Sequence, residues 1–580
     1  MIQGASISPP EAAGGAIRPS PAVVPGWVGI LCLLVCLVGI VDHDLWTPDE
    51  PRDAAIAKDM GRTGNWVVPY LAGEPFVEKP PLYFAVGGAF ARVLGSFVGD
   101  AGAIRLSSAL WGLGTLLTTF LLARRLLGRA HAWLAPAILA TMPGFVVEMH
   151  WIRVDAALCF FVTAAIWCYA EMYLGGRRGF WLPAGLFAGG AFLVKGPIGP
   201  LMIGVALFGI LAPRALARMR GDREASLLPG RLAGSALAAI LPVGIWLVRF
   251  IQVGGPELWR KWFWENQVGR FSGTTPELGH LHPGEPLYYV ESALAYASPW
   301  IVVTVAWLFL SLRDLRRQRR LDPAHAFMLI WSVGAFGLLS VAITKREVYL
   351  APLLPAFAVM AAAVLAREPA RWLRGFGAFW VTVCAVILLC LAALPLAAWL
   401  APSVDRWARM SNLLVARAVF SGFAALACIG IAIGLLRMPL GSRMAAATAL
   451  LFLGLFVSVM PILDSEKSMR RDVQAFAARI PDTRRPRVGG WRLSETMRGA
   501  FGFYCGWTVP PIRDTSRLRT VLEGKDPEFD SIITGPKELA VEKLDVPQRV
   551  LEQASPGDSS NKRTVQWVEG LRAAPGGPSR

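Results

Sequence analysis

Long apolar runs separated by short polar segments dominate the chain from about residue 26 to about residue 462. About thirteen of these runs approach the length of a membrane-spanning helix, which needs roughly 20 mainly apolar residues. They cover residues 26–43, 103–123, 131–149, 156–174, 180–194, 197–213, 231–250, 287–311, 325–343, 347–366, 373–399, 413–436 and 443–462. The pattern therefore predicts a polytopic α-helical membrane protein with about thirteen transmembrane helices.

Composition narrows the class of protein further. Hydrophobic residues make up 54% of the 580 residues and charged residues 17%, whereas soluble proteins carry about 25% charged residues. The 22 tryptophans suit a chain with many membrane interfaces. A soluble enzyme, a coiled coil and a disordered chain are excluded.

The net charge of +17 predicts the orientation of the chain rather than a nucleic-acid partner. Six basic clusters fall on one side of the membrane, provided that the apolar segment 80–98 does not cross it. The clusters are Arg124-Arg125-Arg129, Arg177-Arg178, Arg214 to Arg223, Arg313 to Arg320, Arg367 to Arg374 and Arg437 to Arg443. The positive-inside rule makes that side cytoplasmic. We therefore expect residues 80–98, which contain Pro80, Pro81 and Arg92, to form a membrane-surface or re-entrant helix on the external side.

These patterns divide the chain into four segments. Residues 1–24, rich in Pro, Gly and Ala, are predicted to be a disordered cytoplasmic tail, and residues 25–463 a transmembrane domain with external loops. Charges become frequent after residue 463, which predicts a small external α/β domain over 464–555 and a flexible tail over 556–580. Within the α/β domain we expect helices at 467–479 and 494–504 and strands at 487–489 and 531–533.

Candidate chemistry gathers in the loops predicted to be external, while the cytoplasmic loops hold little besides arginine. The acidic candidates are Asp49, Glu50, Glu78 and Asp155, and the basic ones are Arg52, Lys79, Arg153, Lys195, Arg270, Lys345 and Arg346. Each cluster taken alone could be an interfacial anchor or a loop salt bridge. Together they indicate a site, because carboxylates serve as general bases or metal ligands and Arg and Lys bind phosphate.

The class of substrate follows from where these groups lie. Acids and phosphate-binding cations at the outer membrane boundary suggest a lipid phosphate. No GxxxxGK[ST] or strand-linked GxGxxG motif supports a nucleotide donor. A transporter is the alternative from another class of protein. A transporter would be expected to carry ionisable residues near the centres of its membrane helices, whereas the centres of the apolar runs in this chain are nearly free of charged residues.

Several motifs resemble those of the bacterial aminoarabinose transferases and of their protein O-mannosyltransferase relatives. The resemblance extends over residues 26–462. In chain order the motifs are Pro48-Asp49-Glu50-Pro51-Arg52, Gly64-Asn65-Trp66-Val67-Val68-Pro69, Glu78-Lys79-Pro80-Pro81-Leu82-Tyr83, Arg153-Val154-Asp155, Lys195-Gly196-Pro197, Glu265-Asn266, Gly269-Arg270-Phe271, Lys345-Arg346 and Tyr349-Leu350.

The resemblance implies a GT-C glycosyltransferase of the bacterial inner membrane, with a periplasmic active site and a C-terminal periplasmic domain. The implied donor is a sugar on a polyprenyl phosphate such as undecaprenyl phosphate, and the implied acceptor is lipid A, lipopolysaccharide or another glycolipid. A protein O-mannosyltransferase, which glycosylates Ser or Thr, is the alternative within enzymes. The catalytic carboxylates would fall on Asp49 and Asp155, with Glu50 as a further candidate. The phosphate would be held by Arg52, Lys79, Lys195, Lys345 and Arg346, with Tyr83 and Tyr349 lining the pocket.

One position departs from the family pattern. Some aminoarabinose transferases hold a zinc ion with a glutamate of the first loop and a histidine, and this chain has Asn266 in place of that histidine. Glu78 is the remaining candidate ligand, so a divalent metal such as zinc is expected, if anywhere, near Glu78.

Overall fold

The computed structural model describes residues 26–570 except 47, 222–227, 270–284, 286, 319–321, 343, 368, 401–437, 543–547 and 556–563. The predicted N-terminal tail, the apolar run 413–436 and Arg270 lie outside the described residues.

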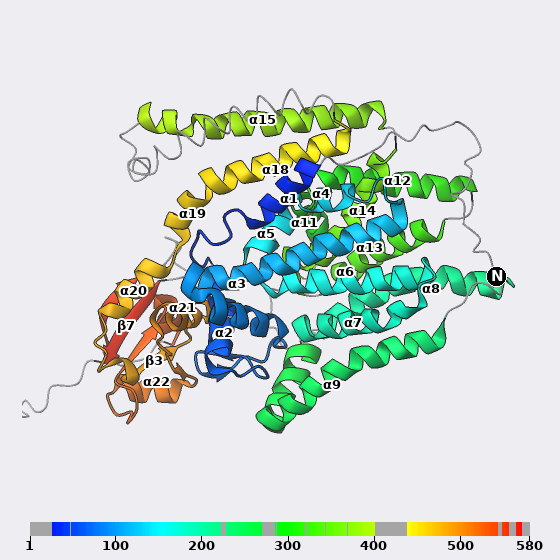
Figure 1. The fold of residues 1–580 in the computed structure, drawn as a ribbon. Coiled ribbons are helices and arrows are strands. Elements are labelled where there is room, and N and C mark those ends of the chain that lie inside the picture. Colours follow the sequence, from blue (N-terminus) through cyan, green and yellow to red (C-terminus); the bar gives the residue numbers. More distant parts are fainter. Residues whose placement is uncertain are drawn as a thin grey trace, which may run out of the picture.

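Helices make up most of the described chain and run roughly side by side (Figure 1). The N-terminal half contains α1 (Gly26–Leu37), α2 (Glu50–Thr63), α3 (Leu82–Leu127), α4 (Leu134–Leu139), α5 (Pro143–His150), α6 (Val154–Tyr173), η1 (Arg178–Phe180), α7 (Trp181–Lys195), α8 (Ile198–Met219), α9 (Pro229–Arg260) and the π-helix η2 (Lys261–Gly269). It is followed by α11 (Tyr288–Tyr296), α12 (Trp300–Gln318), α13 (Pro323–Val341), η4 (Glu347–Leu353), α14 (Leu354–Leu365), α15 (Arg371–Leu400), α18 (Leu440–Ser458) and α19 (Met460–Lys467).

Eight helices of the described residues are long and apolar enough to cross a membrane, or nine if the bent pair α11–α12 counts as one span. Other predicted runs correspond to shorter elements. The described part of α1 has 12 residues and α7 has 15. The run 131–149 divides into α4 and α5, because Pro143 cannot donate a helical hydrogen bond and instead occupies the first turn of α5.

The surface of the helical part identifies its solvent as lipid. Only 17% of the apolar window of α9 is buried, and large apolar side chains such as Leu237, Ile240 and Ile245 are more than half exposed. A contiguous apolar surface of this size is unstable in water but normal in a bilayer. In contrast, α6 has 83% of its apolar window buried and lies at the centre of the helix packing.

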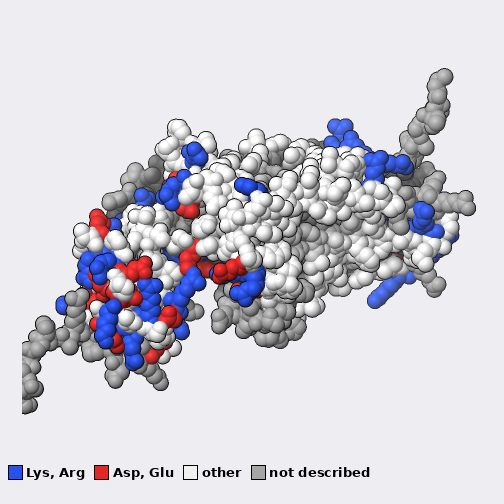
Figure 2. Space-filling model, turned by 90° about the horizontal axis from the view of Figure 1, so that it is seen from below, with Lys and Arg blue, Asp and Glu red and all other residues white. Residues whose placement is uncertain are grey.

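On the face shown in Figure 2, the charged side chains of the described residues gather at the two ends of the helical part. Figure 2 shows a broad band without charged side chains between an end with mixed charges and an end where Lys and Arg predominate. The basic end includes the last turns of α3, α8 and α12, which carry Arg124 and Arg125, Arg218, and Arg316 and Arg317. This distribution is typical of a protein that spans a bilayer with one strongly basic face.

The segment 80–98 is the first half of α3. The helix is broken at Gly99, whose φ of 74° and ψ of 154° are not helical, so residues 82–98 and 100–127 form two arms. The first arm crosses α2 where Gly61 faces Gly88. A Cβ on Gly61 would lie 2.4 Å from the carbonyl oxygen of Gly88, so the two backbones can touch only because both residues are glycine.

The C-terminal sheet unit, residues 470–570, is a five-stranded sheet covered by helices on both faces. Its strands are β3 (Val488–Trp491), β4 (Pro511–Ile512), β5 (Ser531–Thr534), β6 (Gln548–Ala554) and β7 (Val565–Gly570), in the order β4-β3-β5-β7-β6. The β3–β4 and β3–β5 pairs are parallel and the other two antiparallel. The helical elements are α20 (Arg470–Ala478), η6 (Arg485–Arg487), α21 (Glu495–Cys505), α22 (Thr515–Leu522) and α23 (Pro536–Val541).

Neighbouring residues of β5 face opposite sides of the sheet. Ile533 packs in the same cluster as Phe476 of α20 and Phe501 of α21, whereas Ile532 packs with Leu518 of α22. The prediction of a flexible tail over 556–580 is wrong for Val565–Gly570, because these residues form β7 inside the sheet. Val565, Trp567 and Val568 are buried, so a short strand with a mainly buried first half lies within what composition alone marks as polar.

Candidate functional site

The site is built around the start of α2, directly after the first helix. Asp49 occupies the position before α2, and Pro51 in the first turn suits a helix start because its missing N–H is not needed there. Asp49, Arg52 and Asp53 are three and four residues apart and therefore share one face. The helix ends at Gly64, whose φ of 70° favours glycine. A two-stranded hairpin of β1 (Tyr70–Leu71) and β2 (Glu74–Pro75) follows and leads to Lys79.

Asp49 lies between three arginines from distant parts of the chain. Its Oδ1 is 3.2 Å from Arg52 Nη2, and its Oδ2 is 3.2 Å from Arg153 Nε and 2.6 Å from Arg346 Nη2. Burial raises the pKa of Asp49, but Arg52, Arg346 and Arg153 lower it by more, so the net pKa lies well below the usual range of an aspartate. Asp49 is therefore ionised at neutral pH.

Arg52 and Lys79 form the next layer of the site through Asp53. Arg52 Nε is 2.8 Å from Asp53 Oδ1, and Lys79 Nζ is 3.4 Å from Asp53 Oδ2. Burial and the nearby Arg52 lower the pKa of Lys79, and Asp53 and Asp49 offset part of that shift. Asp53 therefore holds two candidate phosphate ligands in place beside Asp49.

The second predicted catalytic carboxylate, Asp155, is paired with a different cation. It lies in the first turn of α6, and its Oδ1 is 2.5 Å from Nζ of Lys195 at the end of α7. Lys195 Nζ also lies 4.4 Å from the ring centroid of Tyr349 in η4. The Asp155–Lys195 pair is linked to the Asp49 cluster through the chain, since Arg153 immediately precedes α6.

Arg153 connects Asp49 to a buried acid that the motifs do not predict. Its Nη1 is 3.1 Å from Oε1 of Glu148, which is fully buried in α5, and its guanidinium lies 4.1 Å from the ring centroid of Trp151. Glu148 lies inside the predicted apolar run 131–149. A carboxylate in such a run needs a charged partner, so its position in the sequence could have indicated a pair of this kind.

Glu50 lies next to Asp49 in sequence but faces the protein interior. Both of its carboxylate oxygens contact the guanidinium of Arg105, at 2.9 and 3.1 Å, and they also accept hydrogen bonds from the backbone N–H groups of Trp46 and Ile152. Arg105 is fully buried and donates to the carbonyl oxygens of His43 and Asp44. Both oxygens of Glu50 are therefore taken up by buried partners, and its catalytic role stays a prediction. Arg105, in the apolar run 103–123, was the missed partner.

Two other predicted residues are also buried. Tyr83 is fully buried, and its hydroxyl is 2.9 Å from Ser108 Oγ, so it joins the two arms of α3 instead of lining a pocket. Lys345 is 5% exposed beside Arg346. Of the predicted site residues in the described chain, the structure brings together Asp49, Arg52, Lys79, Arg153 and Arg346. The Asp155–Lys195 pair, with Tyr349 against Lys195, adjoins them.

A zinc ion at Glu78 would need further ligands from the side chains around it. The backbone oxygen of Glu78 accepts from Gln267 Nε2 at 3.5 Å, and Asn266 donates from Nδ2 to the carbonyl oxygen of Lys261 at 2.9 Å. Within the described ranges, no three His, Cys, Asp or Glu side chains come together as a possible metal site. Structural and catalytic zinc sites use three or four such ligands.

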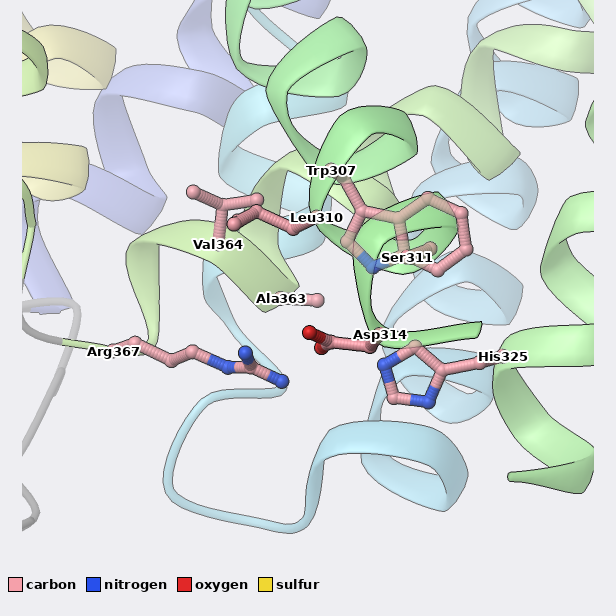
Figure 3. A pocket seen from close by; sticks show the side chains of 8 residues that line it. All are labelled: Trp307, Leu310, Ser311, Asp314, His325, Ala363, Val364 and Arg367. Carbon is pink, nitrogen blue, oxygen red and sulfur yellow. The ribbon is translucent and has the colours of Figure 1, made fainter. Parts of the chain in front are cut away.

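A small polar pocket lies between α12, α13 and α14. Figure 3 shows Asp314 and Arg367 pointing toward each other beside His325, whose ring stacks on Trp307 with centroids 5.6 Å apart. The pocket has a volume of about 10 Å³, which is room for about one water molecule. It is too small for a sugar or a phosphate headgroup.

Comparison with known proteins places these residues in a family context. Residues 78–246 match the model of the dolichyl-phosphate-mannose-protein mannosyltransferase family. The undecaprenyl phosphate-alpha-4-amino-4-deoxy-L-arabinose arabinosyl transferase of Edwardsiella ictaluri is 29% identical over 357 residues, which are 59% of this chain and 60% of the relative. The enzyme of the same name from Aeromonas hydrophila is 28% identical and covers 68% of this chain and 70% of its own length.

A solved structure extends the similarity to the whole fold. The crystal structure of ArnT from Cupriavidus metallidurans bound to undecaprenyl phosphate matches 96% of this chain and 99% of its own, with a TM-score of 0.68 and 20% sequence identity. The chain thus has the fold of the ArnT structure and, over more than half of its length, is similar in sequence to the aminoarabinose transferases, which confirms the resemblance predicted from its motifs.

Proposed function

We propose that this protein is a glycosyltransferase that moves a sugar from a polyprenyl-phosphate donor, undecaprenyl phosphate in bacteria, to a glycolipid acceptor of the lipid A type. The observation that carries this proposal is the cluster in which Asp49 lies between Arg52, Arg153 and Arg346, next to the Asp155–Lys195 pair. The names of the relatives and the undecaprenyl phosphate in the Cupriavidus structure support the class of donor.

An apolar groove between two helices suits the hydrocarbon chain of such a donor. It lies between α8 and α13, has a volume of about 590 Å³ and is lined by apolar residues that include Leu201, Phe208 and Ile330. One wall begins with α8, three residues after Lys195, and the other ends with α13, four residues before Lys345. A lipid in this groove would place its phosphate among the cations of the site.

The ionised state of Asp49 favours a phosphate acceptor. An effective general base has a pKa near the working pH, and the pKa of Asp49 is far below neutrality. Attack by a phosphate oxygen on the anomeric carbon requires no base, because that oxygen is already deprotonated. The new C–O bond forms as the bond between the anomeric carbon and the donor phosphate oxygen breaks, and the polyprenyl phosphate leaves with the bonding electrons. Asp49 then orients the sugar and stabilises positive charge at the anomeric carbon.

The arginine cluster would act mainly on the donor phosphate. Arg52, Arg346 and Lys79 are held near Asp49 by carboxylates, so they are in place before the substrate arrives. Negative charge grows on the phosphate oxygen as the bond to the sugar breaks, and cations placed in advance stabilise that charge. No step requires a metal, and a metal near Glu78 stays a prediction from the resemblance.

For the orientation of the chain, we propose about thirteen spans, with the site and the C-terminal sheet unit in the periplasm of the inner membrane. Residues 82–98 would not cross the bilayer. The arrangement is supported by the basic end of the helical part, which carries the last turns of α3, α8 and α12 and would face the cytoplasm (Figure 2).

The experiment that tests this function is product identification. Purified protein is incubated with a polyprenyl-phosphate sugar and lipid A, and the lipids are analysed by mass spectrometry. We expect sugar on a lipid A phosphate and release of polyprenyl phosphate. Sugar on Ser or Thr of an added peptide, with none on lipid A, would instead assign the chain to protein O-glycosylation, and no transfer to either would reject the proposal.

A further inference from the structure

Helix α21 of the C-terminal sheet unit lies directly against α2, which carries the site (Figure 1). Thr496 Oγ1 donates to the carbonyl oxygen of Pro48 at 2.8 Å, and Lys58 Nζ donates to the carbonyl oxygen of Phe503 at 3.0 Å. The hydroxyl of Tyr504 accepts a hydrogen bond from the backbone N–H of Leu45 at 2.9 Å. These contacts follow the first loop from one side of Asp49 to the other.

One side chain of α21 reaches into the site itself. Glu495 Oε2 lies 3.1 Å from Nη1 of Arg52, whose other two nitrogens contact Asp53 and Asp49. Each nitrogen of the guanidinium therefore has its own carboxylate, and one of the three comes from a residue 443 positions away in the sequence. The side chain of Arg52 is 12% exposed and that of Glu495 is 42% exposed, so Glu495 is the outermost of the three partners.

The backbone of α21 is also fitted to this position. A Cβ on Gly499 would lie 2.5 Å from the carbonyl oxygen of Pro51 and 2.8 Å from Cα of Arg52. Gly499 thus lets the helix backbone touch the Pro51–Arg52 peptide, one turn after Glu495. Gly502, in the same helix, has open space at its Cβ.

We propose that the C-terminal sheet unit completes the site and that Glu495 is a positioning residue for Arg52. The guanidinium is a planar fork, so fixing Nη1 fixes the direction in which Nε and Nη2 point. Glu495 thereby holds Arg52 against Asp49 and sets the geometry that the sugar phosphate meets. The inference rests on the proposed function, because its readout is transfer of the sugar.

The first test is a double-mutant cycle between Glu495 and Arg52. With Glu495→Ala we expect kcat/KM for the polyprenyl-phosphate sugar to fall about tenfold, the size of one lost charge-assisted hydrogen bond. In an Arg52→Ala background, Glu495→Ala is expected to lower kcat/KM by less than about twofold, because the guanidinium that Glu495 contacts is already absent. Glu495→Gln keeps the length of the side chain and an accepting oxygen, so it should restore about half of the lost activity.

A matched control separates positioning from docking of the two units. Arg513 pairs with Glu74 across the same interface but does not contact Arg52, so Arg513→Ala should leave kcat/KM within about twofold of wild type. The proposal is overturned if Glu495→Ala keeps at least half of the wild-type kcat/KM, or if its effect is undiminished in the Arg52→Ala background. If Glu495→Ala does not fold, the cycle is measured with Glu495→Gln, and the proposal is overturned if the effect of that change is undiminished in the Arg52→Ala background.

The second test uses the two glycines of α21. Gly499→Ala forces the helix away from Arg52 and should lower kcat/KM about tenfold or more, because small displacements of positioning groups have large effects on rate. Gly502→Ala makes the same chemical change in open space and should leave kcat/KM unchanged. Equal activity of the two variants contradicts the proposal. Transfer by the wild-type protein is measured alongside, since its absence would reject the proposed function rather than the role of Glu495.

Discussion

Asp49 and Glu50 are neighbours in sequence with opposite environments. Glu50 is 1% exposed and its oxygens are taken up by Arg105 and two backbone N–H groups, so it joins the first loop to α3. Asp49 faces three arginines. Successive residues at the start of a helix point about 100° apart, which separates the two roles. The motif marks both acids, but only the three-dimensional contacts distinguish them.

Glu50→Gln should therefore lower the stability of the fold more than it lowers the rate of sugar transfer. It leaves the buried guanidinium of Arg105 without its counter-charge, and breaking a buried pair in this way typically costs about 3–5 kcal/mol. We expect a marked fall in the melting temperature in detergent, with part of it recovered in the double variant Glu50→Gln/Arg105→Gln. A Glu50→Gln protein that melts like wild type but has lost transfer would return Glu50 to the catalytic group.

Lys79 should show its role in the pH dependence of donor use. Its pKa is lowered, mainly by burial and then by Arg52, so it loses its positive charge at a lower pH than an ordinary lysine. Activity that needs this charge should fall as the pH rises through the lowered pKa, and Lys79→Arg should remove that alkaline decline, because arginine stays charged. Lys79→Ala should weaken donor use about tenfold.

The control for Lys79 is an exposed cation of the neighbouring helix. Arg62, with a side chain 73% exposed, forms an ion pair with Asp59 of the same helix, and Arg62→Ala should leave the donor KM unchanged. If Lys79→Ala behaves like Arg62→Ala at every pH, Lys79 is an interfacial anchor and not a phosphate ligand.

At the scale of elements, apolar periodicity predicts most of the long helices but not where they bend. Residues 82–98 are apolar enough to span and contain Arg92, and only the positive φ of Gly99 and the contact of Gly88 with α2 show that they form a separate arm. β3 and β5 overlap the two predicted strands, whereas β7 was missed because it is short and flanked by polar residues. Whether such a short segment forms a strand depends on its pairing with distant strands and not on its local sequence pattern.

The crossing of α2 with the first arm of α3 gives a prediction at this scale. A Cβ on Gly88 would lie 2.5 Å from the carbonyl oxygen of Ala57, so Gly88→Ala must separate the two helices. We expect a loss of about 1–3 kcal/mol in stability and reduced transfer, measured by melting temperature and turnover. Gly244→Ala in α9, where the added methyl meets open space, is the control. Equal melting temperatures for the two variants would show that the crossing is not tight.

For the whole molecule, the sequence predicts the side on which the cations gather, but it does not predict which distant segments meet. Asp49, Arg153 and Arg346 are recognisable by their motifs, and their contact depends on the packing of α2, α6 and η4. Glu495 carries no motif, and its contact with Arg52 depends on how the C-terminal sheet unit sits on α2. Long-range packing of this kind is what a single sequence leaves open.

Single-cysteine labelling in intact cells tests the orientation of the molecule. Cysteines at Arg62 and Arg513, both largely exposed near the site, should react with a membrane-impermeant reagent from the periplasm. A cysteine at the exposed Arg220, after the end of α8, should react only after permeabilisation. The reverse pattern would place the site in the cytoplasm and contradict the proposed function.

The central claim is that the carboxylate charge of Asp49 drives sugar transfer, and Asp49→Asn tests it most directly because the change keeps the size of the side chain. Release of polyprenyl phosphate from the donor, together with donor binding, is measured for the purified wild-type and Asp49→Asn proteins. We predict that the variant folds and binds donor, while its turnover falls about 10²–10³-fold, as for the loss of one preorganised electrostatic group. A variant that keeps more than about a tenth of the wild-type rate would contradict the account and move the main role to Asp155.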